Sequence, residues 1–328
     1  MGRRRVLALL AGAVALWPPI ALGQSVGRLR NIGVLMGLAE TDPEVLRRVA
    51  IFRQALQDLG WTEGHNIRIH YRSAIEADGL RALGNELLAL QPDVIVAANS
   101  IVASTLLRET RTIPIVFVTA SDPIGDGFVA NLAQPNRNAT GFTGNLASFC
   151  GKWLELLQEI APGTTHFTAL FNPNSAPAGG TYFLPSLQTA AASMSLGLDV
   201  ALLREPTDIE SVLAARAPVG GIIVLPDQFT CAHRESIVEA AARYRVPAIY
   251  PFRSFADAGG LISYGIDVPD LYRRVPSYVH RILNGARPAD LPVLSPAKIE
   301  LVINRRAAGM LGLTVPRIML ARADEVIE

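Results

Sequence analysis

Buried strands that end in short polar loops recur along the chain. Residues 113–118 (IPIVFV) form an apolar run rich in β-branched side chains, which predicts a strand buried on both faces of a sheet. The run ends at residues 119–123 (TASDP), small polar residues followed by a helix start. In open α/β sheets, loops of this kind carry ligand-binding groups at the carboxyl edge of the sheet. The pattern therefore predicts an α/β protein whose site lies where such loops converge.

The first half of the chain alternates predicted strands with amphipathic helices. Apolar residues follow one another at spacings of 4, 3, 4 and 3 on one helix face, namely Val45, Val49, Phe52, Leu56 and Leu59. Strands are predicted at residues 31–36, 66–71, 94–98, 113–118 and 139–143, with helices between the first four. Consecutive β-α-β units predict a parallel sheet with right-handed crossovers.

The same alternation restarts after residue 143. Strands are predicted at residues 166–171, 198–203, 221–225 and 247–250, again separated by helices. Two such units in about 305 mature residues predict two doubly wound, Rossmann-like lobes rather than one core. No linker rich in Gly, Ser or Pro divides the units, so we expect lobes joined by several chain crossings.

A further strand, helix and strand arrive too late in the chain to form a third unit. They are predicted at residues 261–265, 271–282 and 299–303. We expect these elements to return to the first lobe, cross again to the second and so complete both sheets. Lobe 1 would then contain residues 28–144 and 265–289, and lobe 2 residues 145–264 and 290–328. Repeated crossings of this kind would form a hinge.

The amino terminus has the pattern of an export signal. Arg3, Arg4 and Arg5 precede an apolar run at residues 6–17, and small residues lead up to Gly23. Residues 1–23 are therefore predicted to be a signal peptide cleaved after about Gly23, with the general secretory and twin-arginine routes both open. No Cys stands directly after the cut, and no later apolar run reaches the roughly 20 residues that a spanning helix needs. We expect a soluble protein of the periplasm.

The composition argues against several classes of binding partner. Half of the residues are hydrophobic and 18% are charged, as in ordinary globular proteins. Loss of residues 1–23 removes three Arg and changes the formal charge from +1 to −2, which argues against nucleic acid or polybasic membrane contacts. The five His and the two cysteines, Cys150 and Cys231, show no metal-ligand spacing. A disulfide between the two cysteines and two separate buried thiols both remain open. We expect no metal and no cofactor.

Several stretches together resemble one family. They include DLGWTEGHNIRIHYR, IPIVFVTASDPIGDGFVANLAQP, KWLELLQEIAP, FNPNSAP, GGIIVLPDQFTCAHRE, VPAIYPFRSFADAGGLISYGID, PADLPV, KIELVIN and LGLTVPRIMLARADEVIE. The chain resembles, over residues 30–328, the ABC-transporter substrate-binding proteins related to tryptophan- and tyrosine-type uptake systems. The resemblance implies a type I periplasmic-binding-protein fold, in which two α/β lobes close over a small ligand. It also implies docking on an inner-membrane permease driven by an ATPase, and we expect a monomer.

Candidate ligand contacts on lobe 1 follow two of the predicted strands. Asn99 and Ser100 open a helix whose free N–H groups favour a carboxylate, although simple helix capping explains the same residues. Ser121 and Asp122 follow the strand at residues 113–118, and an Asp here could hold an ammonium group. The alternative for Asp122 is a cap on the helix that begins with Pro123.

Lobe 2 offers a second set of candidates. Asn172, Asn174 and Ser175 lie in a polar loop after a strand, where turn chemistry is the alternative explanation. Asp227 and Phe229 follow the strand at residues 221–225, and an acid beside an aromatic ring suits a zwitterion with a flat side chain. Tyr264 lies near the expected hinge, where core packing is the alternative.

The sequence disfavours one alternative function class and leaves another open. A secreted α/β hydrolase is disfavoured because the chain has no G-x-S-x-G elbow and no H-E-x-x-H. A periplasmic sensor for a membrane receptor stays open, because sensing and uptake both use lobe closure. We expect a protein that is not an enzyme and whose ligand is an amino acid or a related small carboxylate, aromatic ones included.

Overall fold

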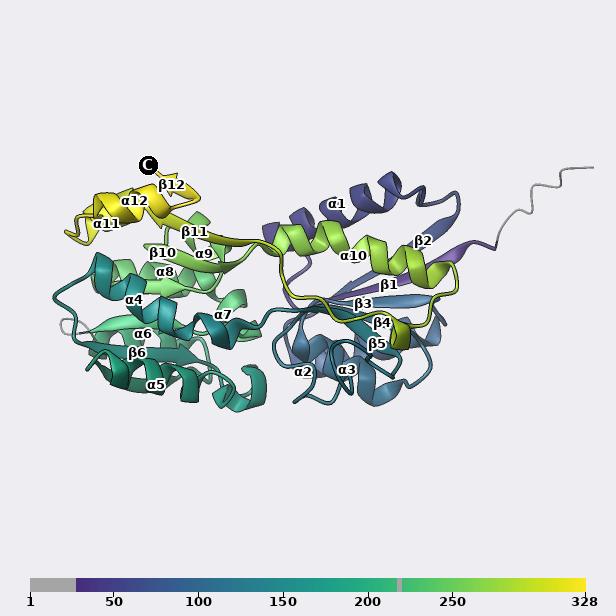
Figure 1. Cartoon of the computed structure of the whole chain (residues 1–328), viewed down its shortest axis with the longest axis horizontal. Coiled ribbons are helices and arrows are strands. Elements are labelled where there is room, and N and C mark those ends of the chain that lie inside the picture. Colours follow the sequence, from purple (N-terminus) through teal and green to yellow (C-terminus); the bar gives the residue numbers. More distant parts are fainter. Residues whose placement is uncertain (1–27, 217–219) are drawn as a thin grey trace, which may run out of the picture.

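Two α/β lobes lie side by side along the long axis of the molecule (Figure 1). The computed structural model describes residues 28–216 and 220–328, so the predicted signal peptide at residues 1–23 lies outside the described residues. Lobe 1, on the right in Figure 1, is built on strands β1–β5, and lobe 2, on the left, on strands β6–β12.

Lobe 1 is built on a parallel sheet with the strand order β2-β1-β3-β4-β5. Its strands are β1 (Arg30–Met36), β2 (Ile67–Ser73), β3 (Val94–Ala97), β4 (Ile115–Ala120) and β5 (Ala139–Thr143). Both β3 and β5 are buried along their whole length, because helices cover the two faces of the sheet. The parallel sheet predicted from the consecutive β-α-β units is confirmed.

Two pairs of helices sandwich the sheet of lobe 1. On one face α1 (Pro43–Asp58) packs against α10 (Val268–Leu283), and on the other α2 (Ala77–Ala89) packs against α3 (Ser100–Glu109) (Figure 1). Helix α1 begins where the Asp42 side chain accepts the N–H of Glu44 and Pro43 takes the first helical position. A helix from late in the chain thus covers the first lobe.

Lobe 2 repeats the plan of lobe 1 and extends it. Its sheet has the order β12-β11-β10-β9-β8-β6-β7, and the part from β7 to β10 has the same order as lobe 1. The strands are β6 (His166–Phe171), β7 (Gly197–Leu202), β8 (Gly221–Val224), β9 (Ala248–Tyr250), β10 (Ile262–Ile266), β11 (Ile299–Asn304) and β12 (Glu325–Ile327). All pairs are parallel except β10 with β11.

Helices cover both faces of this second sheet as well. The neighbouring β8 residues Ile222 and Ile223 belong to hydrophobic clusters on opposite faces, as the pleat requires. One face packs on α4 (Cys150–Ile160) and α5 (Leu184–Ser193), the other on α6 (Thr207–Arg216), α8 (Arg234–Arg243) and α9 (Arg253–Asp257). The remaining elements are short: α7 (Gln228–Ala232), α11 (Arg305–Met310), α12 (Arg317–Arg322) and the 3-10 turns η1 (Leu146–Phe149), η2 (Pro177–Gly180) and η3 (Pro288–Asp290).

The chain crosses between the lobes at several points, which form the hinge. It leaves lobe 1 after Thr143, returns after Ile266, and leaves again between Leu294 and Ile299. The Leu294 N–H donates to the Gly141 carbonyl oxygen at 3.0 Å, so this stretch still belongs to lobe 1. The expected boundary at residue 290 therefore precedes the observed crossing, and the one at residue 265 falls within β10.

One expectation is wrong, namely that the late elements complete the sheet of lobe 1 as well as that of lobe 2. Strands β10, β11 and β12 all join the sheet of lobe 2, whereas lobe 1 receives only helix α10 and a single bridge between Phe142 and Leu294. The local pattern identifies a strand but carries no information about its partner. The antiparallel pairing of β10 with β11 was also not foreseen.

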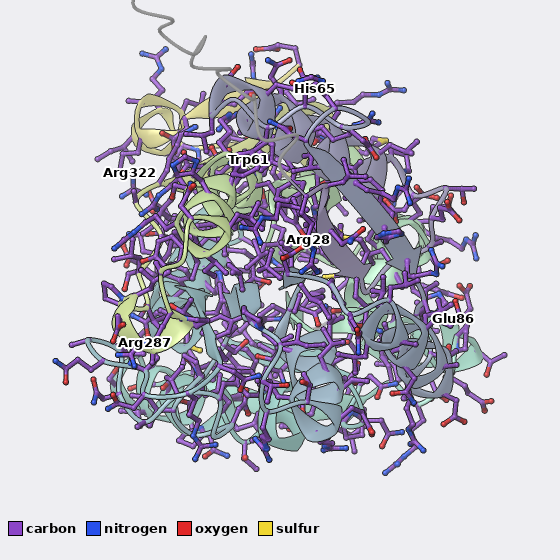
Figure 2. All side chains as sticks on the ribbon, turned by 90° about the vertical axis from the view of Figure 1, so that its right-hand side faces the viewer. Arg28, Trp61, His65, Glu86, Arg287 and Arg322 are labelled. Carbon is purple, nitrogen blue, oxygen red and sulfur yellow. The ribbon has the colours of Figure 1, made fainter. Side chains whose placement is uncertain are left out.

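Apolar and charged side chains are separated as in an ordinary globular protein. Among the largest fully buried side chains are Trp153 and Phe117, one in each lobe. Figure 2 shows the labelled Glu86, Arg287 and Arg322 at the outer edge of the molecule. Among the described residues, no helix has both the length and the apolar character needed to cross a membrane.

Candidate functional site

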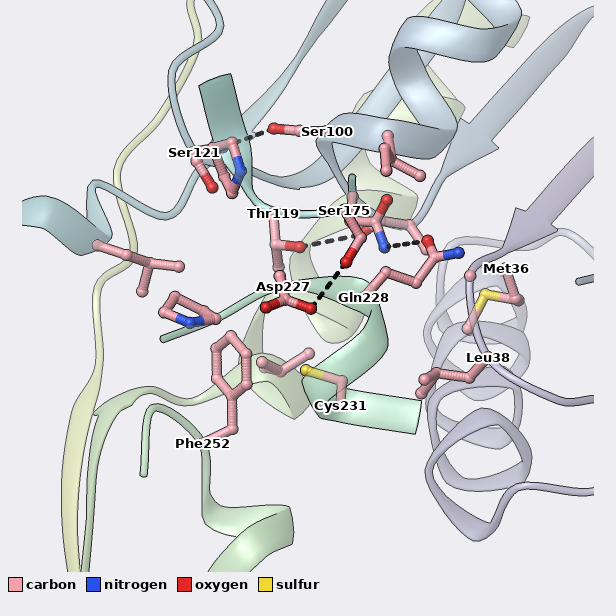
Figure 3. A pocket seen from close by; sticks show the side chains of 18 of the residues that line it. Met36, Leu38, Ser100, Thr119, Ser121, Ser175, Asp227, Gln228, Cys231 and Phe252 are labelled. Atoms are coloured by element: carbon pink, nitrogen blue, oxygen red, sulfur yellow. Dashed lines mark hydrogen bonds between the residues drawn. The ribbon is translucent and has the colours of Figure 1, made fainter. Parts of the chain in front are cut away.

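The main cavity lies between the lobes, at the carboxyl ends of their strands. In each sheet the chain reverses its winding direction between the first and third strands of the unit, β1 and β3 in lobe 1, β6 and β8 in lobe 2. Open α/β sheets bind ligands at such points. The cavity holds about 720 Å³ including the solvent at its mouth, and its lining comes from both lobes and from the hinge (Figure 3).

The lobe 1 wall is centred on the N-terminus of α3. The Asn99 side chain caps this helix by accepting the N–H of Val102 at 3.0 Å, and the Ser100 hydroxyl accepts the N–H of Ser121 at 2.9 Å. Asn99, Ser100 and Ser121 all line the cavity. The first N–H groups of a helix lack partners within it and carry partial positive charge, so this wall favours an anion.

Asp227 is the acidic group of the lobe 2 wall. Its carboxylate accepts hydrogen bonds from the Ser175 hydroxyl at 2.8 Å, the Thr230 N–H at 2.8 Å and the Asn172 N–H at 3.0 Å. Asp227 is only 5% exposed, and this burial raises its pKa from 3.8 to about 6, against the opposing effect of its hydrogen-bond donors. At neutral pH the cavity therefore contains a buried carboxylate that a cationic group would stabilise.

The remaining lining is mainly apolar, with one guanidinium among it. Apolar side chains come from the end of β1 and the loop after it, from the first residues of η1 and α10, and from the residue before α9. They are Met36, Leu38, Leu146, Val268 and Phe252. Arg48 also lines the cavity; it pairs with Glu44 at 3.2 Å, and its guanidinium carbon lies 5.9 Å from the centre of the Tyr272 ring. The apolar lining can hold a hydrophobic ligand group.

The lobes touch each other directly around the cavity. The Gln228 side chain of lobe 2 accepts a hydrogen bond from the Asn99 amide at 3.3 Å and donates one to the Ile75 carbonyl oxygen, both in lobe 1. The Tyr182 hydroxyl of lobe 2 donates to the Ser121 carbonyl oxygen at 2.6 Å. The structure therefore shows a closed arrangement of the lobes.

The structure brings together half of the residues proposed from the sequence. Asn99, Ser100, Ser121, Ser175 and Asp227 line the cavity. The other candidates lie outside its lining.

Three of the outer candidates hold loops in place. The Asp122 carboxylate accepts the N–H of Gly125 at 2.8 Å, as a capping residue would, but the helix expected from Pro123 is absent and residues 123–127 form turns. The Asn172 side chain accepts the N–H of Asn174 at 2.7 Å and donates to the Arg204 carbonyl oxygen at 3.4 Å. These contacts match the turn chemistry considered for this loop.

The two aromatic candidates pack against neighbouring rings. The Phe229 ring lies 4.4 Å from the His233 ring, centre to centre, and Tyr264 lies 5.5 Å from Phe149 in an edge-on arrangement. The Tyr264 carbonyl oxygen also accepts the indole N–H of Trp153 at 2.7 Å, which ties the hinge strand to α4.

Sequence reasoning missed Gln228, Arg48 and Phe252. Gln228 directly follows Asp227 and is the first residue of α7, so its position next to a proposed site residue was the available signal. Arg48 lies on the polar side of α1, and nothing local distinguishes it from a solvated helix residue. Arg48 lines the cavity only because lobe 2 supplies the opposite wall, which the sequence around Arg48 does not indicate.

The described residues offer little reactive chemistry. No group of three or more His, Cys, Asp or Glu side chains among them could hold a metal ion. Cys150 and Cys231 are both free, so they are separate thiols, and burial raises the pKa of each to about 12. Cys231 lines the cavity as a protonated thiol.

The chain forms two doubly wound lobes joined by a hinge, with a cavity where each sheet reverses its winding direction. This is the type I periplasmic-binding-protein fold of two-lobed substrate-binding proteins, as predicted. The family described as ABC transporter substrate binding protein matches residues 34–327. The chain belongs to this family, which confirms the resemblance drawn from the sequence.

Similar proteins include one curated relative and solved structures. A tyrosine-binding protein of Clostridioides difficile (strain R20291) is 22% identical over 301 residues, which cover 90% of this chain and 86% of that protein. A conserved domain protein from Vibrio cholerae is 27% identical, with a TM-score of 0.83 over 91% of this chain and 100% of that chain. An ABC domain from Streptococcus pneumoniae, solved in complex with L-Trp, is 23% identical with the same TM-score and coverage.

Proposed function

We propose that the protein is the exported solute-binding component of an ABC importer. It closes its two lobes over an amino acid or a related small carboxylate, aromatic ones included, and delivers this ligand to a permease in the inner membrane. The family match supports the transport role. The names of the tyrosine-binding relative and of the L-Trp complex favour an amino acid as the ligand.

The observation that carries the proposal is the pairing of opposite electrostatic environments in one cavity. The α3 N-terminus at Asn99 and Ser100 favours a carboxylate, and the buried Asp227 carboxylate favours an ammonium group. The two groups belong to different lobes. A zwitterion would therefore bridge the lobes and stabilise the closed arrangement.

The rest of the cavity sets the requirement for the ligand side chain. Phe252 and Leu146 contribute apolar surface, and Met36 adds an adaptable thioether. An apolar or aromatic ligand side chain would be removed from water against these groups. This favours amino acids such as tyrosine or tryptophan over sugars, which need many polar partners.

Isothermal titration calorimetry with matched analogues tests the assignment of the two walls. The ligands are L-tyrosine, its desamino analogue and tyramine, and the same three forms of tryptophan. We expect each missing charged group to weaken binding at least about tenfold, because a charge-assisted hydrogen bond is lost. Equal affinity for the desamino analogue would remove Asp227 as the ammonium site, and equal affinity for tyramine would remove the α3 N-terminus.

The transport role and the export route have tests of their own. The ligand should be recovered unchanged after incubation, whereas steady turnover would contradict a binding protein. Mass spectrometry of the periplasmic protein should give a mature chain that begins at Gln24. Light scattering should give the mass of a monomer in both ligand-free and ligand-bound samples.

A further inference from the structure

An ion pair joins the two lobes outside the ligand cavity. Arg234, the first residue of α8 in lobe 2, contacts Asp42, which precedes α1 in lobe 1. The two Nη atoms lie 2.6 Å and 3.0 Å from the two carboxylate oxygens, a bidentate geometry. The side chains are only 8% and 9% exposed, and neither residue lines the cavity.

Each partner is held in position by its own lobe. The Asp42 carboxylate accepts the N–H of Glu44 at 2.8 Å and so caps α1. The Arg234 guanidinium donates to the Cys231 carbonyl oxygen at 3.2 Å and lies 3.7 Å from the Glu235 carboxylate. Because these contacts lie within each lobe and do not need the other, little side-chain freedom would be lost when the pair forms.

Gln228 makes a second contact from the same segment of lobe 2. Its amide lies so close to lobe 1 that a Cβ atom added at Gly37 would stand 2.4 Å from Oε1 of Gln228. Gln228 is the first residue of the short helix α7, and Arg234 follows two residues after its end. Helix α7 lies on the side of lobe 2 facing lobe 1 (Figure 1). Together with the Tyr182–Ser121 bond, protein groups alone therefore bridge the lobes at three points, and the ion pair is the one in which neither residue lines the cavity.

We infer that the Arg234–Asp42 ion pair sets the ligand affinity from outside the cavity, by stabilising the closed arrangement. The inference rests on the proposed function, since it concerns the affinity of that same site. Opening the lobes would separate the charges, and each would regain water. For a ligand that binds only the closed form, the apparent dissociation constant equals the intrinsic dissociation constant divided by the closed fraction. A change in the closed fraction therefore changes the affinity for every ligand by the same factor.

The test is a double-mutant cycle with Arg234→Met and Asp42→Asn. Asn retains the ability to cap α1, and Met retains much of the length of the Arg stem. We expect each single variant to bind L-tyrosine or L-tryptophan at least about tenfold more weakly, with a faster off-rate, and the double variant to add little to either. The ratio of affinities between ligands should not change. Arg243→Met is the matched control, because Arg243 lies on the same helix but pairs at 2.7 Å with Glu210 inside lobe 2.

Small-angle X-ray scattering of the ligand-free proteins tests closure without reference to any ligand. The Arg234→Met and Asp42→Asn proteins should have a larger radius of gyration than the wild type and the Arg243→Met control. An unchanged radius of gyration, additive losses in the double variant, or a change in ligand preference would each overturn the inference. Failure of the proposed function would instead show as absence of amino-acid binding in the wild type, with the scattering difference intact.

Discussion

Lowering the pH perturbs the proposed ammonium site directly. Asp227 lines the cavity, and burial raises its pKa to about 6, above its ordinary value of 3.8. The ligand ammonium group attracts the ionised carboxylate and gains nothing comparable from the protonated one. Protonation of Asp227 therefore opposes binding, and affinity should fall as the pH drops through about 6.

The size of the effect follows from the titration of one group. Well above pH 6 the carboxylate is ionised and the dissociation constant should not vary with pH. Below the pKa the dissociation constant should rise by a factor of ten per pH unit, which gives about tenfold weaker binding near pH 5. Isothermal titration calorimetry with L-tyrosine between about pH 8 and about pH 4.5 measures this slope, with circular dichroism as the check that the protein stays folded.

Two variants separate Asp227 from other acids and bases. Asp227→Asn should bind weakly and lose the pH dependence, while Asp122→Asn, outside the cavity lining, should keep the wild-type profile. The His233 ring lies 4.4 Å from the Phe229 ring, and burial lowers the pKa of His233 below its ordinary value of 6.5, so His233 is a second group whose protonation must be separated from that of Asp227. A slope that survives Asp227→Asn would assign the titration to a group such as His233, and a flat wild-type profile would refute the reasoning.

The remaining predictions concern glycines where a side chain has no room. Gly37→Ala should displace the Gln228 and Asn99 amides and break the bond between them, because the added Cβ would lie 2.4 Å from Oε1 of Gln228 and 2.7 Å from Nδ2 of Asn99. Ligand affinity should fall, whereas Gly163→Ala, with nothing within 4 Å, should leave it unchanged. Gly141→Ala should abolish soluble expression, because its φ is +147° and the Cβ would lie 2.0 Å from the Phe117 carbonyl oxygen. Normal yield and melting temperature for Gly141→Ala would contradict this account of the β4–β5 pair.

Much of the fold could be predicted because the signals are local. The buried run at residues 113–118 reads as a central strand whatever its neighbours are, and it became β4, Ile115–Ala120. The Asp42-Pro43 pair marks the start of α1, because an Asp cap and a Pro at the first helical position favour a helix start without any tertiary contact. The partners of the late strands could not be predicted in this way, because β10 and β11 carry apolar runs that suit either sheet.

Asp122 and Asp227 show where local reasoning about the site reaches its limit. Each follows a buried strand and precedes a turn or short helix, so the sequence gives them the same capping signal. The two carboxylates differ in whether a segment distant in the sequence provides their hydrogen-bond donors. The Asn172–Ser175 loop closes over Asp227 and buries it, whereas the Asp122 carboxylate bonds within its own loop.

The residues that hold the lobes together are the least predictable for the same physical reason. Arg234 and Asp42 are 192 positions apart, and Gln228 and Asn99 are 129 apart. In isolation Asp42 is a helix cap and Arg234 a charged residue at a helix start, both normally exposed to water. Only the approach of the second lobe removes that water, so the energy of these contacts belongs to the closed arrangement and not to either lobe. Residues of this kind can control affinity without any contact with the ligand, and they are found from the closed structure rather than from the pattern of the chain.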